Sequence, residues 1–165
     1  MPLDGQQLRQ VMRRWATGIT VVTTRAGEDI HGITVNSFSS LSLQPALCLI
    51  CIDKKTRAHD AIPAAGGFVI NLLASGQEDL SDRFAGRRSD LADPFAGLDL
   101  QAAPSGAPVL RDVLGFLDCS LHAQLPGGDH TIYVGQVEHA AATADDRPPL
   151  VFFGGRYRSL ATLPE

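Results

Sequence analysis

Runs of β-branched and apolar residues, separated by short polar turns, follow one another along most of the chain and predict a mainly β fold. The alternation of apolar and polar positions is clearest over 117–125, which predicts a strand buried on one face. A Gly-rich turn at 126–130 is expected to lead into a partner strand over 131–137. Further strands are predicted at 19–24, 30–35, 46–52, 68–73 and 150–153.

Helical periodicity is confined to short segments. Leu8, Val11, Met12 and Trp15 recur at spacings of three and four residues, so a helix over 3–15 is expected to pack on the body of the domain or on a partner subunit. Shorter helices are predicted at 58–64 and 77–84, and the Gly-, Pro- and Asp-rich stretch 85–107 is interpreted as an ordered excursion. Because strands do not alternate with helices, the pattern favours a predominantly antiparallel barrel formed by one domain over 1–165.

Composition narrows the class of protein. The 165 residues are 44% hydrophobic and 19% charged, with a net charge of -4, which disfavours nucleic-acid binding. No apolar run reaches the ~18 residues of a membrane span and the start lacks a signal-peptide core, so a cytoplasmic protein without membrane contact is expected. The three cysteines suit free thiols. Cys48 and Cys51 match C-x-x-C, but on a strand they face opposite sides, so neither a redox site nor a metal site is expected.

The most informative stretch lies over 31–53, between two apolar runs. It gathers six small hydroxyl or amide side chains and carries no charge over 32–52. Because a surface loop usually includes charges, the stretch is expected to fold inward and to present hydroxyls and backbone amides to a flat ligand with polar edges. Capping of strand ends is the alternative role for Thr34 and Asn36. The six residues are Thr34, Asn36, Ser37, Ser39, Ser40 and Ser42.

A basic loop follows directly. Lys54, Lys55 and Arg57, with the Thr56 hydroxyl, make either a phosphate clasp at a strand end or an ordinary polar loop. The chain contains no G-x-G-x-x-G or P-loop sequence, which disfavours a Rossmann nucleotide fold.

Several segments together resemble the short-chain NAD(P)H:flavin oxidoreductase family, the reductase components of two-component flavin-dependent monooxygenases. The resemblance extends from about Leu8 to Leu160, and the hydroxyl-rich segment followed by the Gly-Asp-His turn is its most specific part. It implies a split β-barrel homodimer (an FMN-binding split barrel) with flavin near the subunit interface. The matching segments are Trp15-Ala-Thr-Gly-Ile-Thr-Val-Val-Thr-Thr, Gly32-Ile-Thr-Val-Asn-Ser-Phe-Ser-Ser-Leu-Ser-Leu-Gln-Pro, Phe68-Val-Ile-Asn-Leu-Leu, Arg83-Phe-Ala, Gly128-Asp-His and Gly154-Gly-Arg-Tyr.

The resemblance also implies roles for individual residues. Segment 34–40 would hold the isoalloxazine ring and ribityl chain of FMN or FAD, and segment 53–57 would meet the phosphate. His130 would orient the nicotinamide of NADH or NADPH, because hydride transfer needs alignment more than it needs an acid or base. Tyr157 would pack near the same site or serve equally as a core or interface residue. The implied cofactor-binding residues are Thr34, Val35, Asn36, Ser37, Ser39, Ser40, Asp53, Lys55, Thr56, Ser81, Arg83, Phe84 and Tyr157.

The expected function is therefore NAD(P)H-dependent reduction of flavin, with reduced flavin passing by diffusion to a partner monooxygenase. Two alternatives remain open. One is a flavin-binding protein of the same fold with little reductase activity, which the Gly-Asp-His turn disfavours. The other is a reductase whose fixed flavin passes electrons to a corrinoid or iron acceptor.

Overall fold

The computed structural model describes residues 3–144 and 146–160 and contains three helices and twelve strands within those ranges. The helices are α1 (Gly5–Met12), α2 (Arg57–Ala65) and α3 (Glu78–Phe84). The strands are β1 (Thr17–Gly18), β2 (Thr20–Ala26), β3 (Asp29–Val35), β4 (Ser39–Leu43), β5 (Ala46–Asp53), β6 (Gly67–Leu72), β7 (Leu100–Ala102), β8 (Pro108–Leu110), β9 (Gly115–Gly127), β10 (His130–Ala142), β11 (Val151–Phe153) and β12 (Arg156–Arg158).

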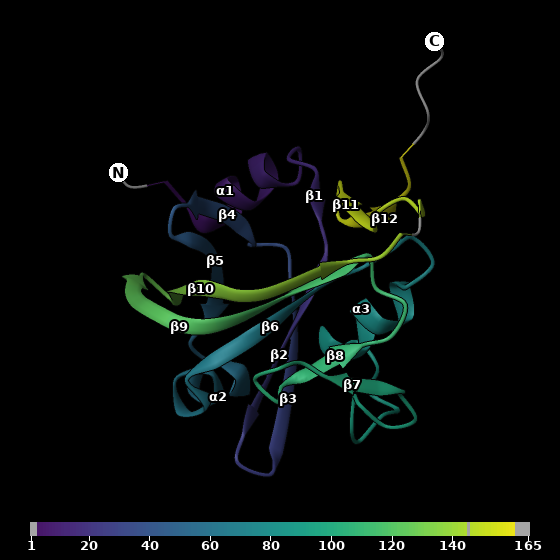
Figure 1. Cartoon of the computed structure of the whole chain (residues 1–165). Coiled ribbons are helices and arrows are strands. Elements are labelled where there is room, and N and C mark those ends of the chain that lie inside the picture. The colour runs from purple at the N-terminus through teal and green to yellow at the C-terminus, as the bar shows by residue number, and fades with distance from the viewer. Residues whose placement is uncertain (1–2, 145, 161–165) are drawn as a thin grey trace.

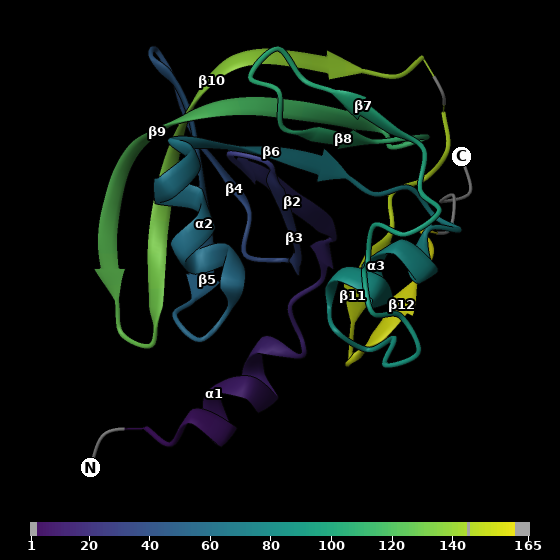
Figure 2. The same cartoon turned by 90° about the horizontal axis from the view of Figure 1, so that it is seen from below.

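Seven strands form one antiparallel sheet in the order β3-β2-β6-β9-β10-β5-β4. The predicted hairpin is confirmed: β9 pairs with β10 through the turn that precedes His130, and β2 pairs with β3 in a second hairpin. The sheet curves around α2, as Figure 2 shows, and β3 and β4 stand at the two ends of its strand order. The mainly β, antiparallel class is thus confirmed, and the described strands form an open, curved sheet.

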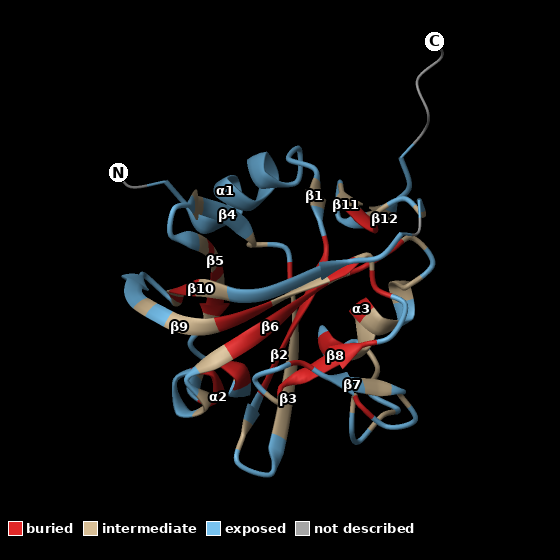
Figure 3. Ribbon diagram, in the orientation of Figure 1, coloured by how far each residue is buried: buried red, intermediate tan, exposed pale blue. Residues whose placement is uncertain are grey.

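The concave side of this sheet holds the main core. Ile50 of β5, Ile70 of β6 and Tyr133 of β10 are fully buried there together with Ile62 of α2. Burial of each large apolar side chain stabilises the fold by roughly 1.5–3 kcal/mol. The Tyr133 hydroxyl donates to the His59 carbonyl oxygen at 2.7 Å, which fixes α2 against the sheet, and burial raises the pKa of this phenol. Figure 3 shows the buried stretches concentrated along the central strands.

A second core joins β3, α3 and the stretch 85–107. The rings of Phe84 and Phe95 meet edge to face with centroids 4.8 Å apart. Gly32 of β3 lies under them, because a Cβ built at this glycine would stand 2.6 Å from the Phe84 ring. The interpretation of 85–107 as an ordered excursion is therefore confirmed, and β7 and β8 form a small antiparallel pair at its end (Figure 1).

The N-terminal helix forms over a shorter range than the predicted 3–15, since it ends at Met12, and it has no buried residue. Asp4 caps it through a capping box with Gln7, which satisfies its first amides. The apolar side chains nevertheless remain exposed, with Leu8 at 52%, Val11 at 67% and Trp15 at 66%. The stripe was predicted to pack either on the body of this chain or on a partner subunit. The first of these predictions is therefore wrong.

The cysteines behave as free thiols. Cys48 and Cys119 are buried and form no disulfide. Their Sγ atoms lie 3.6 Å apart, within hydrogen-bond distance for sulfur. Cys51, three residues after Cys48 on the same strand, is half-buried. Within the described ranges no helix is long and apolar enough to cross a membrane.

Candidate functional site

The hydroxyl-rich segment leaves the end of β3 and crosses to β4, and two of its side chains anchor its path. Thr34 Oγ1 donates to the Ser81 carbonyl oxygen at 2.7 Å, which joins β3 to α3. Ser37 Oγ donates to the Cys51 carbonyl oxygen at 2.8 Å and accepts from the Cys51 amide at 3.2 Å. These hydroxyls hold the segment between α3 and β5, and the Thr34 and Ser37 side chains both have structural partners.

The remaining members of the segment are exposed or provide backbone. Val35 is buried, and its carbonyl oxygen accepts a bond from Thr20 Oγ1 at 3.0 Å. Ser39 and Ser40 are exposed on β4, where Ser39 Oγ donates to the Ser40 carbonyl oxygen at 2.9 Å. Asn36 is also exposed. The groups that this segment offers to a ligand are therefore mainly the Asn36 side-chain amide and the backbone of the segment. It does not present a row of free hydroxyls.

Three cavities follow this segment one after another. The first, of about 470 Å³, is lined by Asn36 and Ser37 together with Trp15, Thr17 and the turn 152–155. The second, of about 160 Å³, shares Asn36 and adds Thr34. The third, of about 840 Å³, shares Thr34 and extends along Thr56, Arg83, Phe84 and the stretch 85–95. Asn36 and Thr34 thus connect the three cavities into one line.

The basic loop is shaped by Asp53 and ends at the first turn of α2. Asp53 Oδ1 accepts a bond from the Lys55 amide at 2.9 Å, and its carbonyl oxygen accepts one from Thr56 Oγ1 at 2.8 Å. Thr56 is the N-cap of α2, but its hydroxyl turns back to Asp53 instead of capping the helix. The His59 amide donates to the Thr56 carbonyl oxygen at 3.2 Å, so the Arg57 and Ala58 amides are the ones that this helix start can offer to an anion.

Tyr157 joins the C-terminal hairpin to α3. Its hydroxyl lies 2.5 Å from Asp82 Oδ1 and 2.9 Å from Ser81 Oγ, and Arg87 Nη1 donates to it at 3.3 Å. Burial, followed by the bond to Asp82, raises the pKa of the phenol. Ser81 is 1% exposed, so its side chain serves this junction. Tyr157 and Ser81 both line the second cavity.

Arg83 and Phe84 hold the wall of the third cavity. Arg83 Nε lies 2.8 Å from Asp79 Oδ2, and its Nη1 donates to the Ala96 carbonyl oxygen at 3.0 Å. The pKa of the Asp79 carboxyl is lowered by this arginine. Phe84 is 5% exposed and belongs to the second core. Both residues therefore tie α3 to the excursion that forms the rest of the wall.

The Gly-Asp-His turn lies beside the basic loop. His130 begins β10 and pairs in register with Asp53 at the end of β5. Its Nδ1 lies 2.8 Å from Asp129 Oδ1, and this contact lowers the pKa of the Asp129 carboxyl. Lys54 Nζ donates to the Gly128 carbonyl oxygen at 2.6 Å. The structure thus brings the turn and the loop together, although His130 is not in the linings of the three cavities.

Two parts of the site were not predicted from the sequence. Trp15 and Thr17 line the first cavity, and Thr17 Oγ1 is buried without a hydrogen-bond partner among the described residues. The stretch 88–95 lines the third cavity. The Trp15-Ala-Thr-Gly match to the family was the available signal for the first part, whereas the composition of 88–95 gave none.

Comparison with known proteins identifies the family. Residues 12–161 match the family described as "Flavin reductase like domain". The chain belongs to this family. It is 36% identical over 159 residues to the reductase subunit HsaB of a flavin-dependent monooxygenase from Mycobacterium tuberculosis, covering 96% of this chain and 83% of the relative. It is 39% identical over 162 residues to an NADH-dependent FAD reductase from Streptomyces globisporus, covering 97% of this chain and 88% of the relative.

Solved flavin reductases have the same fold. The NADH:FAD oxidoreductase SgcE6 of Streptomyces globisporus superimposes with a TM-score of 0.89 at 38% identity, covering 98% of this chain and 96% of its own. The flavin reductase PheA2 superimposes with a TM-score of 0.88 at 34% identity, covering 97% of this chain and all of its own. SgcE6 has also been solved with NAD and FAD fragments.

Proposed function

We propose that this protein is an NAD(P)H:flavin oxidoreductase that supplies reduced flavin to a partner monooxygenase. The carrying observation is the hydrogen bond between Lys54 and Gly128, which fixes the Gly-Asp-His turn beside the loop 53–57. A nicotinamide coenzyme held at His130 and a flavin phosphate held at that loop would then be neighbours. Relatives named as an NADH-dependent FAD reductase and an NADH-dependent flavin reductase support the same activity.

The residues of the site fit a flavin. Asn36 and the backbone of 36–40 offer uncharged donors, which suit a ring that must be held in both oxidised and reduced forms. The buried Thr17 Oγ1, from another residue in the lining of the first cavity, is a further polar atom without a partner among the described residues. When bound, the flavin would supply the ring that accepts hydride, and these residues would orient it and exclude water from one side.

The flavin phosphate is assigned to the first turn of α2. The amides behind Thr56, the Lys55 ammonium and the Arg83 guanidinium provide the charge and the donors. We favour FAD over FMN, because the third cavity continues past Thr56 and Arg83 along 85–95. That space would take the adenylate half that FMN lacks.

His130 is assigned to the incoming nicotinamide. Its ring is held by Asp129 at 2.8 Å and remains 41% exposed, so it is oriented and still accessible to a coenzyme. Its contribution is positional, since hydride transfer from nicotinamide to flavin requires no proton at this ring. NADH is the coenzyme named for several relatives, and NADPH is the comparison that tests it.

A homodimeric split barrel formed by single-domain subunits over 1–165 is part of the proposal. Leu8 and Val11 on α1, Trp15 just after it and Leu43 on β4 are all exposed, Leu43 at 88%. Figure 1 shows α1 and β4 at the same end of the molecule, and Figure 2 shows α1 projecting from the body of the chain. Such a set of exposed apolar side chains is typical of a subunit interface, and a second copy would cover it.

Titration with FMN and FAD, followed by NADH and NADPH oxidation assays, tests this function against its alternatives. A reductase that releases its product gives turnover proportional to added flavin and loses flavin on gel filtration. A flavin binder without reductase activity binds flavin but oxidises neither coenzyme. A reductase for a corrinoid or iron acceptor keeps its flavin on gel filtration and passes electrons to that acceptor.

A further inference from the structure

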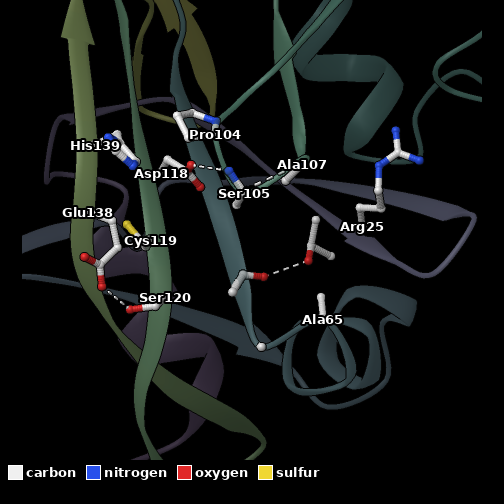
Figure 4. Close-up of a pocket in the computed structure, with 13 residues that line it drawn as sticks. Arg25, Ala65, Pro104, Ser105, Ala107, Asp118, Cys119, Ser120, Glu138 and His139 are labelled. Carbon is white, nitrogen blue, oxygen red and sulfur yellow. Dashed lines mark hydrogen bonds between the residues drawn. The ribbon is translucent and has the colours of Figure 1, made fainter.

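A separate pocket lies on the convex side of the sheet. Asp118, Ser120 and Glu138 from β9 and β10 form one wall, and Ser105 lies beside Asp118 (Figure 4). The cavity measures about 270 Å³, and we call it the outer-face pocket. Side chains alternate along a strand, so Asp118 and Ser120 face away from the core that receives Cys119. The pocket shares no lining residue with the three cavities of the flavin site.

A β-bulge gathers the polar groups of this pocket. The register between β9 and β10 shifts between Val137 and His139, and His139 then pairs with Asp118. Glu138, the extra residue, accepts a bond from Ser120 Oγ at 2.7 Å with its Oε1. Bulges of this kind re-aim side chains, and here the bulge brings a second carboxylate to the face that carries Asp118.

Asp118 is a buried carboxylate with one unsatisfied oxygen. The residue is 1% exposed, and its Oδ2 accepts a bond from the Ser105 amide at 2.9 Å. Its Oδ1 is buried and has no hydrogen-bond partner among the described residues. A buried carboxylate oxygen without a donor is destabilising, so a ligand that donates to it would be favoured.

The lining points to an organic cation. The lining carries two carboxylates, Asp118 and Glu138, and one guanidinium, that of Arg25. Arg25 lies on the opposite wall (Figure 4), where its guanidinium donates to the Gly106 carbonyl oxygen at 2.8 Å. Within the described part of the chain, no three His, Cys, Asp or Glu side chains are grouped to hold a metal ion. The carboxylates therefore suit a group with several directed donors better than a bare ion.

The rest of the pocket suits an aliphatic stem. Ala65, Gly67, Pro104 and Ala107 line it without large side chains. Gly67 allows β6 to pack closely on β9, because a Cβ there would stand 2.5 Å from the Cys119 carbonyl oxygen. We propose that the outer-face pocket binds a guanidinium or ammonium group carried on an aliphatic stem, with donors directed at Asp118 Oδ1 and Glu138.

Isothermal titration calorimetry of the full chain tests this site. The probes are agmatine, as a free organic cation, and N-acetyl-arginine N-methylamide, as an arginine side chain presented by a polypeptide. Saturable binding of either cation, with N-acetyl-norleucine N-methylamide inert, supports the proposal. Preference for agmatine assigns a free ligand, and equal or tighter binding of the blocked arginine assigns a protein-borne side chain.

Matched variants connect the binding to the named carboxylates. Asp118→Asn and Glu138→Gln are each expected to weaken binding about tenfold, because each removes one charge-assisted bond. Glu28→Gln, an exposed acid in the turn between β2 and β3, is the control and should leave binding unchanged. Arg25→Gln, which removes a positive charge from the lining, should strengthen binding. NAD(P)H oxidation should be unchanged in Glu138→Gln, because this pocket is separate from the flavin site.

Any of the following results would overturn the proposal. The first is the absence of saturable heat with both cations, and the second is equal binding of the norleucine probe. The third is cation binding that survives both carboxylate substitutions, or saturable Ca²⁺ binding that both abolish. If Asp118→Asn fails to fold, the exposed Glu138→Gln variant decides the outcome alone.

Discussion

Lys54 Nζ donates a hydrogen bond to the carbonyl oxygen of Gly128 at 2.6 Å, and through it the loop after β5 holds the turn between β9 and β10. The Lys54 amide adds a second bond, to the Asp129 carbonyl oxygen at 3.1 Å. Substitution of Lys54 keeps this backbone bond but removes the side-chain one. The proposed binding sites of the flavin phosphate and of the nicotinamide therefore share one structural element.

Substitutions of the adjacent residues Lys54 and Lys55 should affect nicotinamide binding and flavin binding separately. Lys54→Met should loosen the turn before His130. We expect it to raise the KM for NADH about three- to tenfold, because the loss of one charge-assisted hydrogen bond at the surface has an effect of this size. Lys55→Met leaves the turn intact and should instead weaken flavin binding by a similar factor. Steady-state kinetics and flavin titration of both variants measure the split, and equal effects of the two substitutions on both constants would refute it.

His130→Ala is expected to lower kcat/KM for NADH at least about tenfold while changing flavin affinity less than about twofold, since the ring orients the coenzyme alone. His122→Ala, on the exposed face of β9, is the control. Kinetics with varied NADH at saturating flavin provide the measurement. An unchanged kcat and KM would remove His130 from the site.

Tyr157→Phe should destabilise the fold by about 1–3 kcal/mol, because it leaves the buried Ser81 hydroxyl and Asp82 without their shared partner. Urea denaturation followed by circular dichroism measures the change in the free energy of unfolding. A variant as stable as the wild type would show that the junction between β12 and α3 contributes nothing to stability.

The same residue predicts a pH dependence. The pKa of Tyr157 is raised in the folded chain, chiefly by burial, so the fold favours the neutral phenol. Its contribution is fully present below the unfolded pKa near 10 and is lost as pH rises through the higher folded pKa. Above about pH 10 the wild type should therefore lose stability more steeply than Tyr157→Phe. Tyr133, whose pKa is also raised, is present in both proteins and cancels in the comparison.

Leu43→Glu should convert the proposed dimer to a monomer, because it places a charge in the exposed apolar set that includes Trp15. Ala64→Glu, an exposed position on α2, is the control and should remain dimeric. Sedimentation velocity across a range of concentrations distinguishes the two species. A wild-type chain that sediments as a monomer at every concentration would contradict the proposed homodimer.

The sequence predicted the strands well because their alternation is governed by local burial. The pattern over 117–125 and the turn before His130 recur in the structure as β9 and β10, although both strands run several residues further than expected. Strands β1, β7, β8 and β12 were not predicted, because strands of two or three residues carry too little periodicity unless a strongly apolar run marks them, as it does at β11. Their positions depend on long-range pairing that no local pattern specifies.

The site was only partly predictable for a different reason. The sequence showed that Thr34 and Ser37 are small and polar but not where their hydroxyls point, and the structure directs both to backbone groups. It likewise showed an apolar stripe on α1 but not whether this chain covers it. Side-chain direction depends on neighbours distant in sequence, such as Ser81 and Cys51, so composition alone could not distinguish structural hydroxyls from those offered to a ligand.

Anaerobic stopped-flow mixing of NADH with the protein and FAD tests the central claim most directly, since it observes flavin reduction itself. We predict bleaching of the visible flavin absorbance at a rate proportional to protein concentration, faster with NADH than with NADPH, and slowed at least about tenfold in His130→Ala. Bleaching no faster than that of NADH and FAD without protein would contradict the assignment of this chain as a flavin reductase.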